Sequence, residues 1–501
     1  MCPSRSSRSA TLDCKTRPRS GVNWGLSWAL ATVIAWVTGC ASTTEPVAIS
    51  DHCEPLTDPI RLHEIDFDGT YTVGLVDGHV LFSYLASSSD TERPWVARAQ
   101  WFDRDLRAET SVFWLGDSRH AVIPRWTTFG HALFGQPWVV PESDGDLPPI
   151  RSHVAIYRLA PGSTEFERTP RELPIVTSFD SRPDFTPVLI GSTSATAGPQ
   201  ALAGASVGHG RPVFVLNAIP ASCSHSAFIN AARLFVFDAE AVYVNQHGDD
   251  PCSVMGSIAD HEHDATLVSL SDGGLGVLYR QGALLHYARI GSDLRVLDQP
   301  PHLVGSTTRN WLIPGGYQAR AAQVDSGPIL FTERSEENDT NVCSNLRLVD
   351  PDGRNARFAP WQLPCRPPRD RDRFAPWLTA WLAVEPLAAG HAALVWGERT
   401  NVAPGLEYVT RLTTEVDWQE GVFLTTIDGQ GRRAAEIVRV SAPESTAVVG
   451  GVPRTPTSGP FPGDFQVMAA SEGDEVVVVW RDLRPDAPGY YGRRYRCSAL
   501  D

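Results

Sequence analysis

The stretch "GDEVVVVWRDLRPDAPGYYGRRYRC", Gly473–Cys497, lies almost at the end of the 501-residue chain and decides how its fold is interpreted. A glycine turn is followed by four valines and a tryptophan, then by a polar segment and a second strand-like run that ends in cysteine. This pattern predicts a buried β-hairpin. Chain ends are usually poorly ordered, so a strong hairpin at this place requires a structural reason.

The same pattern, a glycine turn before a short apolar run, occurs seven times. The copies begin at Gly78, Gly130, Gly210, Gly274, Gly327, Gly390 and Gly473. A strand-like segment precedes the glycine, and two further strand-like segments follow, so each unit is predicted to be four antiparallel strands, A to D. No amphipathic helical pattern of useful length appears after residue 40. Repeated four-stranded sheets predict an all-β, seven-bladed β-propeller, with an array of sandwiches or two stacked β domains as alternatives.

The two ends of the chain predict how the propeller closes. The last copy contains strands A, B and C before the sequence ends at Asp501. The segment "PIRLHEIDF", residues 59–67, precedes the first copy and is expected to supply the missing fourth strand. Closure by an N-terminal strand would remove exposed sheet edges and hold both chain ends, which explains the strong terminal hairpin. We therefore expect residues 59–501 to form the propeller domain.

The first 40 residues are expected to direct export. A basic leader precedes an apolar run, Trp24–Val37, which is short for a membrane span and typical of a signal peptide. The run ends in Val37-Thr38-Gly39-Cys40, which resembles a bacterial lipobox. The resemblance implies a signal peptide over residues 1–39, lipidation of Cys40 and a tether over residues 40–58. It also implies an outer-membrane or cell-surface location, since Ala41 replaces the aspartate of an inner-membrane retention signal. The alternative is a plain secretory signal.

The charge of the mature chain excludes several functions. Residues 1–39 hold five of the 43 basic and one of the 58 acidic residues, which leaves 38 against 57 and a net charge of −19. Such an acidic chain has no broad basis for binding nucleic acid. Lys15 is the only lysine, so lysine chemistry such as a Schiff base or a P-loop is excluded from the mature chain. We expect a monomer without a cofactor.

Six cysteines follow Cys40, and an even number in an exported chain predicts disulfides. The repeat selects one of the fifteen possible pairings. The expected bridges are Cys53–Cys497 across the closure, Cys223–Cys252 within the third copy and Cys343–Cys365 within the fifth.

Two short motifs contain residues that could form a chemical site. "GASVG", Gly204–Gly208, matches G-x-S-x-G, but Ser206 is expected in an A strand followed by a hairpin, whereas a nucleophile elbow needs a helix. "HEHD" offers His261, His263 and Asp264 as metal ligands, without a further ligand that can be placed. We expect a solvated loop there and no metal site.

"SSDTERPW", Ser88–Trp95, resembles the Asp-box of sialidase-like propellers, S-x-D-x-G-x-x-W. Ser88, Asp90 and Trp95 match, whereas Glu92 replaces the glycine. The match occurs in one copy and in a B–C loop, while the family places its Asp-box in the C–D turn. Coincidence is the alternative.

Charged residues mark the ends of the B strands in copies four to seven. The ligand-binding candidates there are Arg280, Glu333, Arg334, Glu398, Arg399, Arg481 and Asp482, joined on the same face by Trp311 and Trp377 from the D–A loops. Guanidinium groups, carboxylates and tryptophans suit a polar or carbohydrate-like ligand. The alternative is that these charges cap strands at a wet surface and pair with one another.

We therefore expect a non-catalytic, exported lipoprotein whose propeller presents a binding face to a protein or glycan partner. The alternatives are a sialidase-like, glycan-active hydrolase and an outer-membrane assembly factor. A hydrolase would need two carboxyl groups that face a shared cleft. Fold alone does not decide between these functions.

Overall fold

The computed structural model describes part of the chain between residues 51 and 499. The described ranges are 51–64, 71–87, 95–118, 126–129, 132–142, 151–176, 204–207, 211–218, 233–238, 262–281, 284–292, 297–298, 301–306, 321–337, 341–363, 382–388, 390–398, 421–441, 467–482 and 489–499. Within these ranges the regular elements are β-strands, which confirms the all-β prediction. No helix in the described ranges has the length and apolarity that a membrane span requires.

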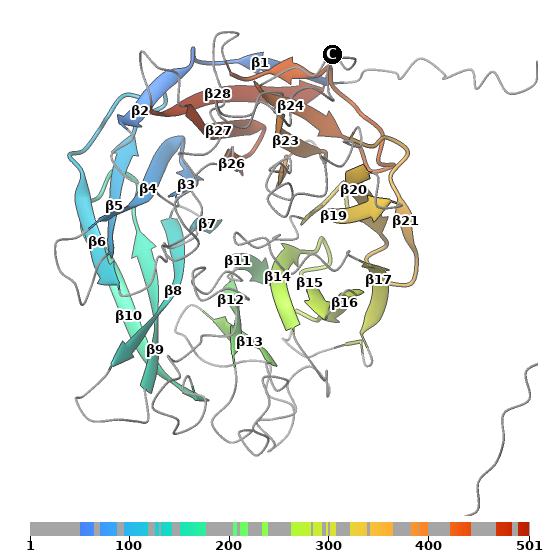
Figure 1. Ribbon diagram of the computed structural model, residues 1–501, viewed down its shortest axis with the longest axis horizontal. Coiled ribbons are helices and arrows are strands. Elements are labelled where there is room, and N and C mark those ends of the chain that lie inside the picture. Colours follow the sequence, from blue (N-terminus) through green and yellow to red (C-terminus); the bar gives the residue numbers. More distant parts are fainter. Residues whose placement is uncertain are drawn as a thin grey trace, which may run out of the picture. The chain divides into compact units, whose positions relative to one another are not determined.

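The strands form seven sheets that follow one another along the sequence (Figure 1). The first contains β3 (Tyr71–Val76), β4 (His79–Ser87), β5 (Trp95–Phe102) and β6 (Phe113–Ser118). The second contains β7 (Trp126–Phe129), β8 (Ala132–Glu142), β9 (Arg151–Leu159) and β10 (Phe166–Val176), and the third contains β11 (Gly204–Val207), β12 (Arg211–Ala218) and β13 (Arg233–Asp238). The fourth contains β14 (Glu262–Ser269), β15 (Leu275–Gln281), β16 (Leu284–Ile290) and β17 (His302–Ser306).

The remaining three sheets continue the pattern. The fifth contains β18 (Ala321–Gln323), β19 (Ile329–Glu337), β20 (Asn341–Val349) and β21 (Ala356–Phe358). The sixth contains β22 (Leu382–Pro386), β23 (Ala392–Glu398), β24 (Gly421–Ile427) and β25 (Val438–Arg439). The seventh contains β26 (Val467–Glu472), β27 (Glu475–Asp482) and β28 (Gly489–Ala499), with β1 (Asp51–Pro55) and β2 (Ile60–Glu64) both paired to β28. Neighbouring strands pair antiparallel throughout, so the predicted four-stranded antiparallel unit is confirmed.

The repeat glycines within the described ranges fall between the first and second strands of a sheet, where the A–B turn was expected; they are Gly78, Gly274, Gly327, Gly390 and Gly473. Gly78 shows why glycine is used there, since its φ of 80° follows a φ of 50° at Asp77. Two consecutive residues with positive φ match the tight hairpin turn that favours glycine. The repeat found in the sequence therefore corresponds to a recurring turn.

Neighbouring sheets are joined at these turns by hydrogen bonds. The Ser271 N–H donates to Gln323 Oε1 at 2.6 Å, between the fourth and fifth sheets. The Asp325 N–H donates to Gly390 O at 2.6 Å, between the fifth and sixth sheets. The bond from Ala388 N–H to Gly473 O, at 2.9 Å, joins the sixth and seventh. At the end of the sheets that carries the A–B turns, here called the turn end, backbone N–H groups thus donate hydrogen bonds to acceptors in the neighbouring sheet.

The first strands also contact one another in sequence order. β3 contacts β7, β7 contacts β11, and the series continues through β14, β18 and β22 to β26, which contacts β3. Apolar side chains are buried between successive sheets. Four such clusters lie at the junctions of the fourth to seventh sheets and of the seventh with the first.

The four valines of the opening stretch line both faces of β27. Val476 and Val478 pack in the cluster shared with the sixth sheet, whereas Val477 and Val479 pack in the cluster shared with the first. Successive strand residues point to opposite faces, so a strand that is buried on both faces becomes a continuous apolar run. The run at residues 476–479 is therefore explained by its position between two sheets.

The N-terminal segment completes the seventh sheet on the outer side of β28. Ile60 pairs with Gly492 and Glu64 with Gly489, within the segment that was expected to supply this strand. β1 also pairs with β28, although residues 40–58 were expected to be a tether. The sheet structure thus includes residues from Asp51 onward.

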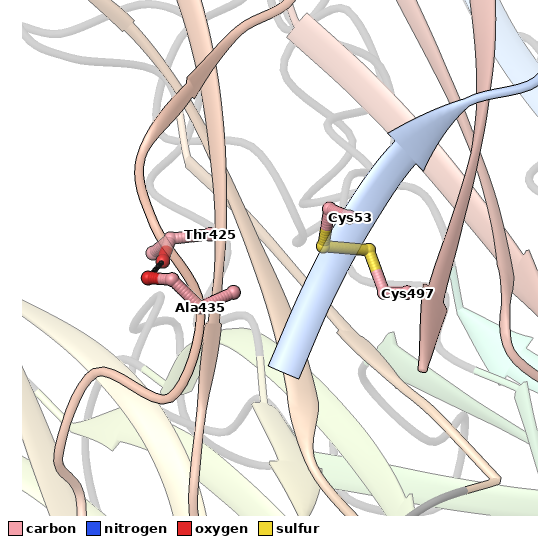
Figure 2. Close-up of a disulfide and its surroundings, with 4 residues drawn as sticks. All are labelled: Cys53, Thr425, Ala435 and Cys497. Atoms are coloured by element: carbon pink, nitrogen blue, oxygen red, sulfur yellow. Dashed lines mark hydrogen bonds between the residues drawn. A yellow bond between two sulfur atoms is a disulfide. The ribbon is translucent and has the colours of Figure 1, made fainter. Parts of the chain in front are cut away.

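A disulfide joins Cys53 of β1 to Cys497 of β28, with the two Cα atoms 4.1 Å apart (Figure 2). The two residues lie directly opposite in the register, and both are buried in the cluster that includes Ala435 of the sixth sheet. Figure 2 also shows the bond from Thr425 Oγ1 to Ala435 O, at 2.8 Å, beside the disulfide. The other two expected bridges involve Cys223, Cys252 and Cys365, which lie outside the described residues, and the side chain of Cys343, which also lies outside them.

Arg494 links the seventh sheet to both the first sheet and the N-terminal segment. Its side chain is 2% exposed and forms an ion pair with Glu475 of β27. The guanidinium also donates to Gly78 O at 2.7 Å, and the Arg494 N–H donates to Thr57 Oγ1 at 3.0 Å. A buried arginine is tolerated only when its donors find acceptors, and here three separate segments provide them.

The fourth sheet differs from the sequence prediction at its first strand. Its last strand, β17 (His302–Ser306), pairs with β16. Before it, Leu297 donates its N–H to Arg289 O, and the Asp298 carboxylate accepts the Arg289 N–H at 2.8 Å. The "HEHD" motif was expected in a loop, but it overlaps the start of β14, where Glu262 pairs with Gln281.

Candidate functional site

The candidate site lies at the end of the sheets opposite to the turn end, where the second strands finish. This end is here called the strand-B end. Arg280 lies one residue before the end of β15, Glu398 ends β23, and Arg481 and Asp482 end β27. Glu333 and Arg334 lie within β19, which continues to Glu337. Of the sequence-predicted residues, Arg399, Trp311 and Trp377 lie outside the described ranges.

Strand alternation places Arg481 and Asp482 on opposite faces of β27. Asp482 follows by two residues Trp480, which packs toward the sixth sheet. Because residues i and i+2 share a strand face and adjacent residues do not, Arg481 belongs to the face toward the first sheet. The side chains of the other predicted residues on these strands lie outside the described residues, namely Arg280, Glu333, Arg334 and Glu398.

Among the described residues, the best-defined part of the site is the junction between the seventh and first sheets. Arg481 lies directly opposite Tyr490 in the register of β27 and β28. Tyr71 of β3 is fully buried and donates its hydroxyl to Val479 O at 3.1 Å. The Tyr71 ring lies 4.8 Å from the Tyr490 ring, centroid to centroid. The junction thus places one guanidinium among tyrosine side chains.

Three further rings extend this aromatic group toward the N-terminal strand. His63 of β2 stacks on Tyr84 of β4 with ring centroids 4.2 Å apart. Phe82 lies 5.3 Å from Tyr490 and 5.7 Å from Tyr84, centroid to centroid. The aromatic junction, defined as Tyr71, Phe82, Tyr84, Tyr490 and His63, therefore combines residues from the first and seventh sheets. Its three tyrosines and Phe82 are at most 1% exposed, so these rings form part of the core between the two sheets.

The electrostatics of this junction centre on Arg481 and Tyr71. Burial, and then the nearby Tyr490, raise the pKa of Tyr71 well above its usual value of 10, while Arg481 acts in the opposite direction. Tyr71 is therefore a neutral donor at physiological pH. Arg481 is partly buried, and its Nε atom has no hydrogen-bond partner in the described part of the chain.

Asp482 and Trp480 occupy the other face of β27. Asp482 is 1% exposed, and Trp480 is completely buried and lies 6.1 Å from Tyr491, centroid to centroid. Asp482 and Arg481 are neighbours in sequence on opposite faces of one strand. The alternative in which the arginine simply pairs with its neighbouring carboxylate does not hold for Arg481, because the structure gives it no ion pair in the described residues.

The remaining sequence motifs do not form a site in the described residues. Ser206 lies in β11, which pairs directly with β12 in a hairpin, so the strand–turn–helix of a nucleophile elbow does not occur there. Within the described ranges no group of three His, Cys, Asp or Glu residues is arranged to hold a metal ion. Residues 88–94 of the Asp-box-like stretch lie outside the described ranges, between β4 and β5.

The sequence prediction missed the aromatic residues that surround Arg481. Tyr490 was present in the opening hairpin, and counting outward from the loop between β27 and β28 would have placed it opposite Arg481. Tyr71 and Tyr84 belong to the first copy, where no charged residue drew attention to the strand end. Their proximity to Arg481 depends on the contact between β26 and β3, which no local pattern reveals.

No protein-family model matches the sequence, and no curated protein matches it. Solved structures similar to this chain include the β-propeller domain of the Trilobed protease from Pyrococcus furiosus, at 9% identity, 86% coverage of this chain, 98% of that chain and a TM-score of 0.39. Another is the α-L-arabinanase of Penicillium chrysogenum, at 10% identity, 90% and 99% coverage and a TM-score of 0.34. The Trypanosoma rangeli sialidase shows 10% identity, 85% and 53% coverage and a TM-score of 0.32.

Proposed function

We propose that this protein is an exported, lipid-anchored β-propeller that binds a hydroxyl-rich, polar ligand of the glycan class at the strand-B end. The observation that carries the proposal is the grouping of arginine, carboxylate and aromatic residues along the ends of the second strands in the last four sheets. Guanidinium groups and carboxylates recognise sugar hydroxyls by hydrogen bonding, and aromatic rings pack on apolar sugar faces.

The proposed propeller has seven blades and is closed by the N-terminal strands. Each of the seven sheets would be one blade, with the third represented by three described strands. The contacts of first strands in sequence order, including β26 with β3, support one closed series. The pairing of β1 and β2 with β28 and the Cys53–Cys497 bridge support closure by both chain ends. Closed series of sheets avoid exposed edges, which favours this arrangement.

The proposed anchor is a lipid on Cys40. β1 begins at Asp51 opposite Ala499, and Glu54 lies opposite Arg496, which pairs with Glu475 beside the A–B turn. The chain thus enters the seventh sheet at the turn end. Eleven residue steps separate Cys40 from Asp51, so the proposed tether spans at most about 40 Å.

The ligand proposal is tested with the mature protein on a glycan array, followed by titration of the best ligand. Arg334→Ala and Arg399→Ala should each weaken binding by at least about 1 kcal/mol, as expected for charge-assisted hydrogen bonds, while the melting temperature stays nearly unchanged. Intact binding in both variants would remove the strand-B end from consideration. It would direct the search to the turn end or to a protein partner.

A glycan-active hydrolase is the second candidate, because carboxylate positions recur near the ends of three second strands, at Glu333, Glu398 and Asp482. Most glycoside hydrolases use two carboxyl groups roughly 5–10 Å apart on either side of the bond that is cleaved. Incubating the mature protein with any array ligand and analysing the products separates the candidates. Cleavage that is lost in Glu398→Gln would favour the hydrolase, whereas an intact ligand would favour binding alone.

A further inference from the structure

The N-terminal segment, residues 51–64, forms the outer edge of the seventh sheet but buries few side chains of its own. Its buried hydrophobic residues are Cys53 and Leu62, and Ile60 is partly buried against the cluster between the seventh and first sheets. The exposed residues of the segment are His52, Glu54, Pro55, Asp58, Arg61 and Glu64. A segment that buries so little apolar surface gains little from the hydrophobic effect.

The segment is held mainly by polar contacts with β28. β1 and β2 both pair with the backbone of β28. Between them, the Leu56 N–H donates to Arg494 O at 2.8 Å, and the Arg494 N–H donates to Thr57 Oγ1 at 3.0 Å. The stacking of His63 on Tyr84, with centroids 4.2 Å apart, adds a contact with the first sheet. The attachment of the segment therefore depends largely on one neighbouring strand.

β28 is attached to the rest of the protein independently of this segment. It pairs with β27 along the whole length of that strand. Tyr490 and Tyr495 are fully buried in the clusters on the two faces of the sheet. The Arg494 side chain keeps Glu475 and Gly78 O as partners. The strands β26, β27 and β28 would therefore remain a sheet if the N-terminal segment detached.

The Cys53–Cys497 bridge is the strongest attachment of the segment, and it joins the middle of β1 to β28 (Figure 2). Among residues 52–55, Cys53 is the one buried side chain. Without the bridge, β1 would keep its backbone pairs and the contact of Glu54 with Arg496 at 3.8 Å, in which both side chains are about half exposed. An exposed ion pair contributes little, and a strand with few buried contacts opens locally at low cost.

We infer that residues 51–64 form a latch, fastened by the Cys53–Cys497 bridge, that sets how far the sheets can extend from the membrane anchor. This inference goes beyond ligand binding and rests on the lipid proposed for Cys40. With the latch closed, the eleven residue steps from Cys40 to Asp51 span at most about 40 Å. With the latch open, thirty-one steps lead from Cys40 to Tyr71, the first residue of β3, and span at most about 110 Å.

The latch is opened by a dithiol that reduces the bridge. One thiolate of the dithiol attacks a sulfur of the bridge, and its second thiol resolves the mixed disulfide that results. The dithiol is oxidised to a disulfide, and its two electrons and two protons leave Cys53 and Cys497 as thiols. Because Cys53 is 3% and Cys497 is 1% exposed, attack requires β1 to separate from β28 first. Reduction of the native protein should therefore be slow.

Hydrogen exchange of the lipidated mature protein in detergent tests the latch. Cys53→Ser with Cys497→Ser should speed exchange of the hydrogen-bonded amides of residues 51–64 at least about tenfold, whereas β27 should change less than about twofold. Cys343→Ser with Cys365→Ser, the pair expected in the fifth copy, is the matched control and should leave residues 51–64 unchanged. Unchanged exchange at residues 51–64 in the first variant would overturn the inference. Equal acceleration in all sheets would also overturn it, because the bridge would then stabilise the whole fold.

Neutron reflectometry of the protein anchored in a supported bilayer tests the change in extension. The mean end-to-end distance of a flexible chain grows with the square root of its length, so opening the latch should move the protein layer about 10 Å away from the bilayer. Dithiothreitol should move the wild-type layer by the same distance as the double substitution does. A layer that stays in place, although residues 51–64 exchange faster, would overturn the role in extension.

The mass of the mature N-terminal peptide separates this inference from the proposed anchor. Cys40 without a lipid would reject the anchor and, with it, the role in extension, whereas faster exchange at residues 51–64 would still support the latch. A lipidated Cys40 together with unchanged exchange at residues 51–64 would support the anchor and overturn the inference.

Discussion

Glu472, at the end of β26, accepts a hydrogen bond from the backbone N–H of Gly78 at 2.8 Å, although the two residues are 394 positions apart in the sequence. The other carboxylate oxygen accepts the N–H of Asp77 at 2.7 Å. The last A–B turn thus binds the first one through a charged side chain, whereas Gly390 O and Gly473 O are the acceptors at the two preceding junctions. The Glu472 carboxylate therefore joins the two ends of the series of sheets.

Glu472→Gln should destabilise the protein by about 1–2 kcal/mol. A glutamine can accept only one of the two N–H bonds and presents an amide to the other, and bonds to a charged acceptor are worth more than neutral ones. Urea unfolding of the two proteins measures the change. Glu64→Gln is the control, because its side chain is 79% exposed and should leave the free energy of unfolding nearly unchanged. A loss at Glu472 no larger than at Glu64 would contradict the role given to this contact.

Stability in acid should depend on Glu475. Burial disfavours its charged form, but the hydrogen bonds and charges of Arg494, and then of Arg496, outweigh burial and hold the pKa of Glu475 below its ordinary 4.5. A carboxyl group whose pKa is lower in the folded state contributes stability that is complete above the ordinary pKa. That stability is lost as the pH falls through the folded-state pKa. The wild type should therefore lose stability as the pH falls below about 4.5.

Glu475→Gln tests this dependence through urea midpoints measured from about pH 3 to 7. At neutral pH the variant should be less stable by about 3 kcal/mol, since Arg494 remains buried without its anion. The difference should shrink in acid, because the wild-type carboxylate is then protonated as well. Curves that run parallel over the whole range would show that Glu475 does not titrate with folding.

The Cys53–Cys497 bridge should stabilise the protein by restricting the unfolded chain. The cysteines are 444 positions apart, and in the chain-entropy model long loops gain the most, with observed losses on removal of about 2–5 kcal/mol. The double variant Cys53→Ser with Cys497→Ser should unfold at lower urea concentration by this amount. Peptide mapping without reduction checks the pairing directly. A Cys53–Cys223 peptide would contradict it.

The sheets could be predicted from the hydrophobic periodicity of the sequence and from its turn residues. The seven glycines, the antiparallel units and the strand at residues 60–64 all follow from local patterns whose physical cause lies within a few residues. An error arose at "HEHD", which was expected in a loop, whereas Glu262 pairs with Gln281 at the start of β14.

The candidate site was less predictable, because it depends on which strands meet. The arginines and carboxylates were visible at the strand ends, but the sequence did not reveal that Arg481 faces Tyr71 rather than pairing with Asp482. To predict the surroundings of Arg481, one must know which residues of β27 share a face of the strand, and that β26 contacts β3.

The last prediction compares the same substitution at two buried tryptophans of this protein. Trp101 and Trp480 are both fully buried, but the Trp101 Nε1–H donates to Ser163 O at 2.7 Å, whereas the Trp480 Nε1 has no partner among the described residues. Phenylalanine removes the N–H and part of the ring in both cases, so the packing loss should be similar. Trp101→Phe should also leave the Ser163 carbonyl without its donor, and should therefore cost about 1 kcal/mol more than Trp480→Phe in urea unfolding. Equal losses, or a larger loss at Trp480, would mean that the Trp480 indole makes a polar contact in solution, for instance with water. In that case the junction between the sixth and seventh sheets would be wetter than its valine-rich core indicates.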